Sequence, residues 1–228
     1  MHIPGAAEMG AGPAHCRDRV LLRPGPDGHS ASPPGTPALI ITRQRCNDRR
    51  PMSDPQPPKP AKLIVGFFLK DRSLAGEIAR KLQERLGDVD MVSPWHDFDF
   101  TTYYDREMGS PLSRRLIVFK ALVEQRRLAE IKLATNRLEL AYRQEGRRRV
   151  NIDPGYLLAE RFVLATGKNF THRIYLDQGI YADLTLIYCK GGFRTLPWTY
   201  PDYADSRLID FLTLVRNKYM LDVKGLRN

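Results

Sequence analysis

Cysteine is scarce in this chain, with three residues among 228. Cys16 and Cys46 lie in the first quarter of the sequence, so Cys189 stands alone in the part that carries a foldable pattern. A single cysteine excludes an intrachain disulfide and a CxxC zinc knuckle in that part. It also suits a reducing compartment, and we therefore expect a cytoplasmic protein.

Long apolar runs are also missing. No stretch approaches the ~20 apolar residues that a membrane-spanning helix needs, and the N-terminus lacks the apolar core of a secretory signal. We therefore expect neither a membrane segment nor a targeting signal. The formal net charge of +10 favours an anionic partner or simple solubility, because net charge bears on association and not on fold.

The N-terminal stretch has little that could form a core. Residues 1–51 are rich in Gly, Pro, Arg and His, with "ALII" at 38–41 as the one apolar cluster, and four prolines follow in "MSDPQPPKP". So little apolar surface does not offset the entropy of ordering a chain. The composition predicts a disordered extension over 1–61, with Met52 as the candidate true start, and one domain over 62–228.

The first half of that domain alternates strand and helix patterns. "KLIVGFFLK" at 62–70 is a continuous apolar run, which predicts a central strand buried on both faces. Apolar residues at every fourth position predict a helix over 74–86 that ends at Gly87. The alternation over 98–102 predicts a half-exposed strand, and "DREMGSP" at 105–111 predicts a loop.

The second half continues with a strand over 114–122 and a helix over 124–144. Pro154-Gly155 predicts a turn, and strands over 160–196 include a hairpin at Gly191-Gly192. A last helix is expected over 206–220. This order predicts an α+β fold with helices packed on a mostly antiparallel sheet: a ferredoxin-like core, an added hairpin and a C-terminal helix.

A family resemblance is carried by five polar and aromatic segments in matching order. They are "TTYYDREMG" (101–109), "IKLATNRLE" (131–139), "VNIDPGYLLAERFVLAT" (150–166), "HRIYLDQGIYADLTL" (172–186) and "PWTYPDY" (197–203). Together, from about 62 to 219, the chain resembles the bacterial family called domain of unknown function 4416. The resemblance implies no established fold, substrate or catalytic residue.

Some members of that family bear a GTP-binding label, which the residues here do not support. A P-loop needs G-x-x-x-x-G-K-[ST] to wrap backbone N–H groups around phosphates. Gly167-Lys168-Asn169 is the nearest approach, and Phe162 stands where the first glycine would be. The sequence therefore predicts no P-loop.

Candidate ligand contacts lie in three places. Lys168, His172 and Arg173 gather positive charge before a strand, where arginine suits phosphate or carboxylate; the alternative is a solvated strand end. Trp198 and Tyr200, fixed between two prolines, either pack inward or form a wall for a planar ligand. We expect packing, above all for Trp198. The third group is a polar stripe on a predicted helix, formed by Lys132, Asn136 and Glu139. The alternative interpretation of this stripe is an ordinary solvent-exposed helix face.

Candidate acid–base residues are Asp153 and Glu107. Asp153 follows three arginines that would keep it ionised, although an Asx residue before a turn also simply stabilises the turn. Carboxylates and one histidine near Glu107 could hold a divalent metal, but no recognised ligand spacing is present, so the metal and any cofactor stay unknown.

Two function classes remain open. The first is a protein that binds a small anionic, nucleotide-like ligand, either as an enzyme or as a binding protein. The second is a non-catalytic module for RNA or another protein, which would present aromatics surrounded by basic residues. Here the aromatics neighbour aspartates, as in Tyr104-Asp105 and Asp202-Tyr203. Carboxylates repel phosphate backbones, so the small ligand is favoured over nucleic acid. The sequence leaves the oligomeric state open.

Overall fold

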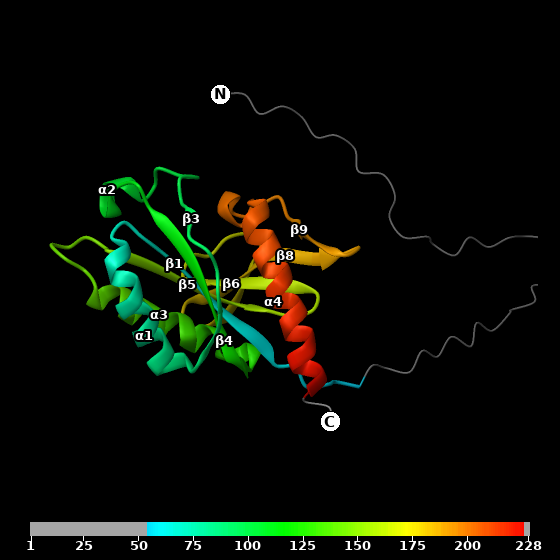
Figure 1. The fold of residues 1–228 in the computed structure, drawn as a ribbon. Helices are drawn as coiled ribbons and strands as arrows, with labels where there is room; N and C mark the ends of the chain where they lie inside the picture. Colours follow the sequence, from blue (N-terminus) through cyan, green and yellow to red (C-terminus); the bar gives the residue numbers. More distant parts are fainter. Residues whose placement is uncertain (1–53, 226–228) are drawn as a thin grey trace, which may run out of the picture. The chain divides into compact units, whose positions relative to one another are not determined.

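The structure is a computed structural model that describes residues 54–225, so most of the predicted extension lies outside the described residues. From residue 61 onward the described chain builds a large antiparallel sheet with helices on both faces (Figure 1). This arrangement confirms the α+β fold class.

The sheet runs in the order β2-β4-β1-β5-β6-β8-β7, with β3 beside β4 and β9 beside β8. All paired strands are antiparallel. The strands are β1 (Ala61–Leu69), β2 (Val89–Val92), β3 (His96–Asp97), β4 (Ser113–Val123), β5 (Val150–Leu157), β6 (Arg161–Thr166), β7 (Arg173–Asp177), β8 (Ile180–Cys189) and β9 (Gly192–Thr195).

Four α-helices accompany the sheet in the described part of the chain: α1 (Ala75–Leu86), α2 (Asp105–Met108), α3 (Leu128–Ala141) and α4 (Ser206–Gly225). Helices α1 and α3 share one apolar cluster with β1, while α4 packs into another, on the opposite face (Figure 1). The order β1-α1-β2-β4-α3-β5, with β1 between β4 and β5, is the ferredoxin-like core that the sequence predicts.

Strand β1 is the centre of the fold because it is buried along its whole length. Successive side chains of a strand point to opposite faces. Val65 and Phe67 therefore meet α1 and α3, whereas Ile64 meets the side of α4. The continuous apolar run thus did predict a strand covered on both sides.

Lys62 is the exception within this apolar strand, and it ties three elements together. Its Nζ lies 2.5 Å from Asp90 on β2 and 2.7 Å from Asp222 on α4, and the side chain is fully buried. A buried charge is tolerated only when it is paired and hydrogen-bonded. The pairing therefore fixes the C-terminal helix to the sheet.

The segment after β3 differs from the prediction. The strand ends at Asp97, and the residues expected to form a strand over 98–102 leave the sheet. Phe98 instead stacks on Phe68 at 4.2 Å between ring centroids, and Tyr104 meets both rings. The segment predicted as a loop also contains α2. Burial of the aromatic rings against the sheet determines this path. In the sequence, such rings give the same alternating pattern as a half-exposed strand, so the pattern alone did not distinguish the two.

Pro154-Gly155 is not a turn: both residues lie inside β5. Pro154 pairs with Val65 of β1, and the pairing of β5 with β6 begins at Gly155. A proline is acceptable in a strand where no partner needs its missing N–H. A Cβ on Gly155 would come within 2.5 Å of the Val163 carbonyl oxygen, so glycine lets β6 approach closely.

The remaining predictions for the C-terminal part are confirmed. The β8–β9 hairpin forms, with its turn at Lys190-Gly191, one residue earlier than expected; both residues have positive φ angles of 49° and 83°. Helix α4 buries the apolar stripe that the sequence indicates: Leu208, Phe211, Leu212, Val215 and Tyr219.

Candidate functional site

The site begins where β5 and β6 separate. In the described chain β5 pairs with β6 only from Gly155 to Leu157, while β6 continues alongside β8 as far as Thr166. The stretch 151–154 of β5 therefore has no strand on its outer side among the described residues. We call this stretch the open edge of β5.

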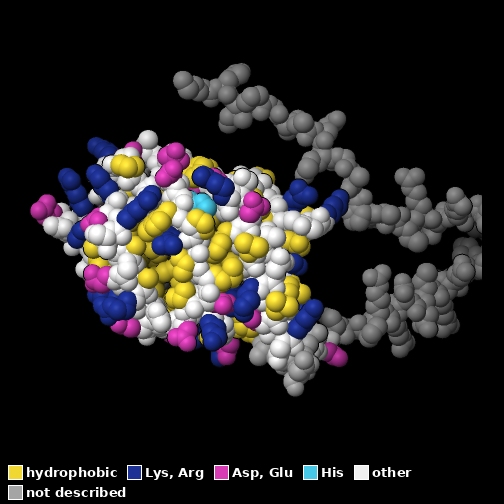
Figure 2. Space-filling view, viewed as in Figure 1, with side chains coloured by type: hydrophobic (Ala, Val, Ile, Leu, Met, Phe, Trp, Pro, Cys, Tyr) yellow, Lys and Arg dark blue, Asp and Glu magenta, His cyan; other side chains and the backbone are white. Residues whose placement is uncertain are grey.

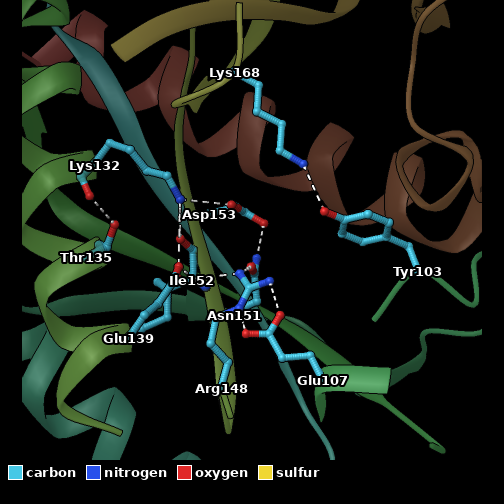
Figure 3. A network of polar contacts seen from close by, with 10 residues as sticks. All are labelled: Tyr103, Glu107, Lys132, Thr135, Glu139, Arg148, Asn151, Ile152, Asp153 and Lys168. Carbon is cyan, nitrogen blue, oxygen red and sulfur yellow. Dashed lines mark hydrogen bonds and ion pairs between the residues drawn. The ribbon is translucent and has the colours of Figure 1, made fainter. Parts of the chain in front are cut away.

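Two side chains from α3 take the place of the missing strand. The Lys132 ammonium donates to the Ile152 carbonyl oxygen at 2.8 Å, and the Ile152 N–H donates to a Glu139 carboxylate oxygen at 2.8 Å (Figure 3). Lys132 and Glu139 are seven residues apart, which is two helical turns and places them on one helix face. Buried backbone groups need such partners.

Asp153 lies at the same point, and α3 reaches it as well. Lys132 Nζ is 3.0 Å from Asp153 Oδ1, and the Asn151 amide donates to Asp153 Oδ2 (Figure 3). The Asp153 side chain remains 32% exposed, while Lys132 and Asn151 are buried. These two buried side chains therefore hold the carboxylate in place, and the carboxylate still reaches solvent.

The charges beneath Asp153 are largely compensated. Burial raises the pKa of Glu139 even though Lys132 lies 3.8 Å away. Lys132 already contacts Ile152, Asp153 and Glu139, so the protein itself occupies its ammonium group. Lys132 and Glu139, expected to bind a ligand, thus act here by positioning β5 and Asp153.

Glu107, the second predicted acid–base residue, is held by an arginine. Arg148 donates from Nε and Nη2 to the two Glu107 oxygens at 2.8 and 2.6 Å, and from Nη1 to the Asn151 side-chain oxygen at 2.8 Å. The hydrogen bonds from Arg148 lower the pKa of Glu107. The pair links α2 to Asn151 of β5, and Asn151 in turn donates to Asp153.

The charge of Asp153 acts on two tyrosines that precede helices. Burial raises the pKa of Tyr104 to about 12, and the Asp153 charge adds to the shift. Burial likewise raises the pKa of Tyr200, with further contributions from Asp183 and Asp153. Asp153 is therefore near enough to act electrostatically on a ring before α2 and on a ring before α4.

His172 and Arg173 were expected to bind an anion, but the structure gives them a partner within the protein. Asp183, buried on β8, lies 3.2 Å from His172 Nε2 and 2.8 Å from Arg173 Nε. Arg173 also donates to the Lys168 carbonyl oxygen at 2.9 Å and to the Tyr200 hydroxyl. Arg173 thus compensates the buried carboxylate and fastens Tyr200, and His172 contacts the same carboxylate.

The "PWTYPDY" segment divides its rings between core and surface. Tyr203 is buried against Phe162, whereas Trp198 and Tyr200 are 37% and 38% exposed. Trp198 stacks on His172 at 4.7 Å between ring centroids and donates to the Leu184 carbonyl oxygen. Trp198, for which we expected packing above all, thus packs on His172 and is as exposed as Tyr200.

A row of exposed groups follows from these contacts. The Lys168 ammonium reaches Tyr103, 3.5 Å from its hydroxyl and 4.9 Å from its ring centre (Figure 3). Phe170 lies 6.0 Å from the Arg173 guanidinium, which in turn bonds Tyr200. Tyr103 and Phe170 are 64% and 62% exposed. We call Tyr103, Lys168, Phe170 and Tyr200 the rim.

Sequence reasoning found Lys168, Tyr200 and Asp153 but missed several of their neighbours. Arg148, Asn151 and Tyr103 contact the predicted residues. Arg148 carried a signal as the middle of three arginines, and Asn151 as an Asx residue two positions before Asp153 in "NIDPGY". Asp183, a carboxylate in the otherwise largely apolar strand β8, was not predicted as a site residue. Asn136 is half-buried on α3, and within the described part of the chain its side chain makes no hydrogen bond.

Two other chemistries were tested against the described residues. Residues 54–225 bring no three His, Cys, Asp or Glu side chains together in a way that could hold a metal ion. Gly167-Lys168 follows β6 and leads into strand β7, and Phe162 is a buried β6 residue. A P-loop opens a helix, so this turn is not one.

Comparison with known proteins places the chain in a family. The family described as "Domain of unknown function (DUF4416)" matches residues 59–219, and the chain belongs to it. Neither the curated proteins nor the solved structures contain a match to this chain. Over the part of the chain that the structure describes, every helix is too short or too polar to cross a membrane.

Proposed function

We propose that this protein binds a small anionic ligand with a planar group, nucleotide-like in character, at the rim beside Asp153. The observation that carries the proposal is the exposed Lys168: its ammonium lies against the Tyr103 ring, and its carbonyl oxygen accepts from Arg173, which also contacts Phe170 and Tyr200. Lysine contacts phosphate as a point charge, and aromatic faces stack on planar bases at about 1–3 kcal/mol each.

The remaining residues divide into those that meet the ligand and those that hold the site. Lys168 contacts the anionic group and the rim rings contact the planar group, while Asp153 faces the ligand from beneath. Lys132, Arg148 and Arg173 position the site, because their donors are engaged with protein acceptors. Asp153 is also the group placed to exchange a proton with a bound substrate, should the ligand be transformed.

The nucleic-acid alternative has less support. A half-exposed carboxylate at the centre of the site repels a polyphosphate backbone, and the face drawn in Figure 2 intersperses Asp and Glu with Lys and Arg. Nucleic-acid-binding domains carry clustered basic patches or stripes. Cys189, the one cysteine among residues 54–225, is free and exposed, as suits the reducing cytoplasm in which we propose that the protein acts.

The test is a thermal-shift screen of the full chain with nucleoside monophosphates, sugar phosphates and inorganic phosphate, followed by calorimetry on any hit. A ligand at ~100 times its Kd stabilises the folded state by ~2.7 kcal/mol. Lys168→Met should weaken binding at least about tenfold. Lys120→Met, at an exposed lysine of β4, is the matched control and should leave binding unchanged. Equal binding by both variants would refute the proposed site.

A further inference from the structure

The Asp153 carboxylate has unused acceptor capacity that faces solvent. Its Oδ1 accepts from Lys132 and its Oδ2 from Asn151, one bond each. An ionised carboxylate offers about four lone-pair sites. Each oxygen therefore keeps one acceptor position, and the 32% exposure of the side chain leaves these positions within reach of a ligand.

The two bonds also fix the orientation of the carboxylate. Lys132 and Asn151 are both buried, so the groups that hold Asp153 are themselves held by the packing of α3 and β5. Preorganised acceptors bind donors with little loss of side-chain entropy. Asp153 is therefore built to meet hydrogen-bond donors, and its negative charge excludes it as the contact for a phosphate group.

We infer that the ligand presents a vicinal diol, such as the 2′- and 3′-hydroxyls of a ribose, to the two oxygens of Asp153. This inference rests on the proposed function. In a nucleoside monophosphate the sugar joins the planar base to the phosphate. In the proposed function the rim rings and Lys168 take the two outer parts. Asp153, less exposed than Tyr103, Phe170 and Tyr200, is the acceptor that remains for the connecting sugar. Two adjacent hydroxyls supply the two donors that the free acceptor positions require.

The experiment compares ligands that differ only in these hydroxyls. Calorimetry is run on the full chain with AMP, GMP, CMP and UMP, and with the 2′,3′-dideoxy form of each monophosphate that binds. Hydrogen bonds to a charged acceptor are the stronger class. We expect the ribonucleotide to bind at least about tenfold more tightly than its dideoxy form, a ratio that corresponds to about 1.4 kcal/mol.

Variants then separate this inference from the proposed function. In Asp153→Asn the preference for the ribonucleotide should fall to about one, while Lys168→Met should weaken both forms by the same factor. Equal wild-type affinity for both forms, with Lys168 still required, overturns the diol contact and leaves the proposed function standing. No saturable binding of any monophosphate overturns both. The wild-type comparison needs no variant to fold.

Discussion

The Lys132 ammonium on α3 lies 3.0 Å from the Asp153 carboxylate on β5 and also donates to the Ile152 carbonyl oxygen beside it. One side chain thus completes the open edge of β5 and compensates the charge at the centre of the site. The fold and the site both depend on this contact, so a substitution of Lys132 should affect both the stability of the protein and the geometry of the site.

Lys132→Met should therefore be strongly destabilising. It leaves the Ile152 carbonyl without its donor and removes the cation near Asp153 and Glu139. Removing one partner of a buried ion pair costs about 3–5 kcal/mol. Arg137→Met, at an exposed arginine of the same helix, is the control and should change the free energy of unfolding by less than about 0.5 kcal/mol. Urea unfolding measures both; similar, small losses would contradict the role given to Lys132.

The close approach of β5 and β6 gives a second prediction. Gly155→Ala places a Cβ within 2.5 Å of the Val163 carbonyl oxygen, a backbone atom that cannot move alone. Overpacking of this kind costs about 1–3 kcal/mol. Gly76→Ala in α1 meets nothing within 4 Å and should stabilise by about 0.5–1 kcal/mol. Opposite signs of the two shifts in melting temperature are expected, and two shifts of the same sign would be evidence against this packing.

Truncation of rings before α4 tests how the "PWTYPDY" segment is used. Trp198→Ala and Tyr200→Ala should each destabilise less than Leu212→Ala, because both rings are more than a third exposed and Leu212 is fully buried. A buried leucine truncation costs about 2–5 kcal/mol. Denaturant melts of the three variants give the comparison. Losses at Trp198 and Tyr200 as large as at Leu212 would make the segment a structural clamp and remove Tyr200 from the rim.

The Glu107–Arg148 pair predicts a dependence of stability on pH. Hydrogen bonds from Arg148 lower the pKa of Glu107 below its ordinary value of 4.5 in the folded state. A carboxyl with a depressed folded pKa stabilises the fold above its unfolded pKa, and this contribution is lost as the pH falls through the folded pKa. Glu107→Gln should therefore be less stable than the wild type at pH 7, with the difference shrinking below about pH 4.5.

Unfolding curves between pH 3 and pH 7 measure this difference. Glu84→Gln is the control, since Glu84 is an exposed α1 residue paired only with Arg80 on the same helix in the described chain. A wild-type advantage over Glu107→Gln that stays constant down to pH 3 would exclude the ion pair as its source.

GTP gives the last prediction. Because Gly167-Lys168 joins two strands and Phe162 fills the place of the first P-loop glycine, we expect no magnesium-dependent preference for GTP over ATP at micromolar concentration. Calorimetry with both nucleotides, with and without Mg²⁺, is the measurement. A saturable one-to-one isotherm with GTP and none with ATP would be the contrary result.

The local sequence pattern was enough to predict those elements that bury the same face or faces along their whole length. The apolar run of β1 and the fourfold spacing of α1 and α4 each indicated their structure, because burial on both faces or on one stripe leaves a periodic mark in the sequence. The alternation of these elements was also enough to predict the α+β class and the ferredoxin-like core.

The sequence by itself also marked Asp153, Lys168 and Tyr200 as candidates, but their arrangement depended on tertiary contacts. The polar stripe of α3 has the spacing of a solvent-exposed face. Because β6 separates from β5, the Ile152 backbone is left without a strand partner on that side in the described chain, and Lys132 and Glu139 bond to it instead. Pro154-Gly155 has the composition of a turn, yet it lies in a strand because nothing pairs with Pro154 on its outer side in the described chain. Hydrogen bonds between residues of different elements leave no periodic mark in the sequence, so the tertiary structure alone decided which of the candidates meet.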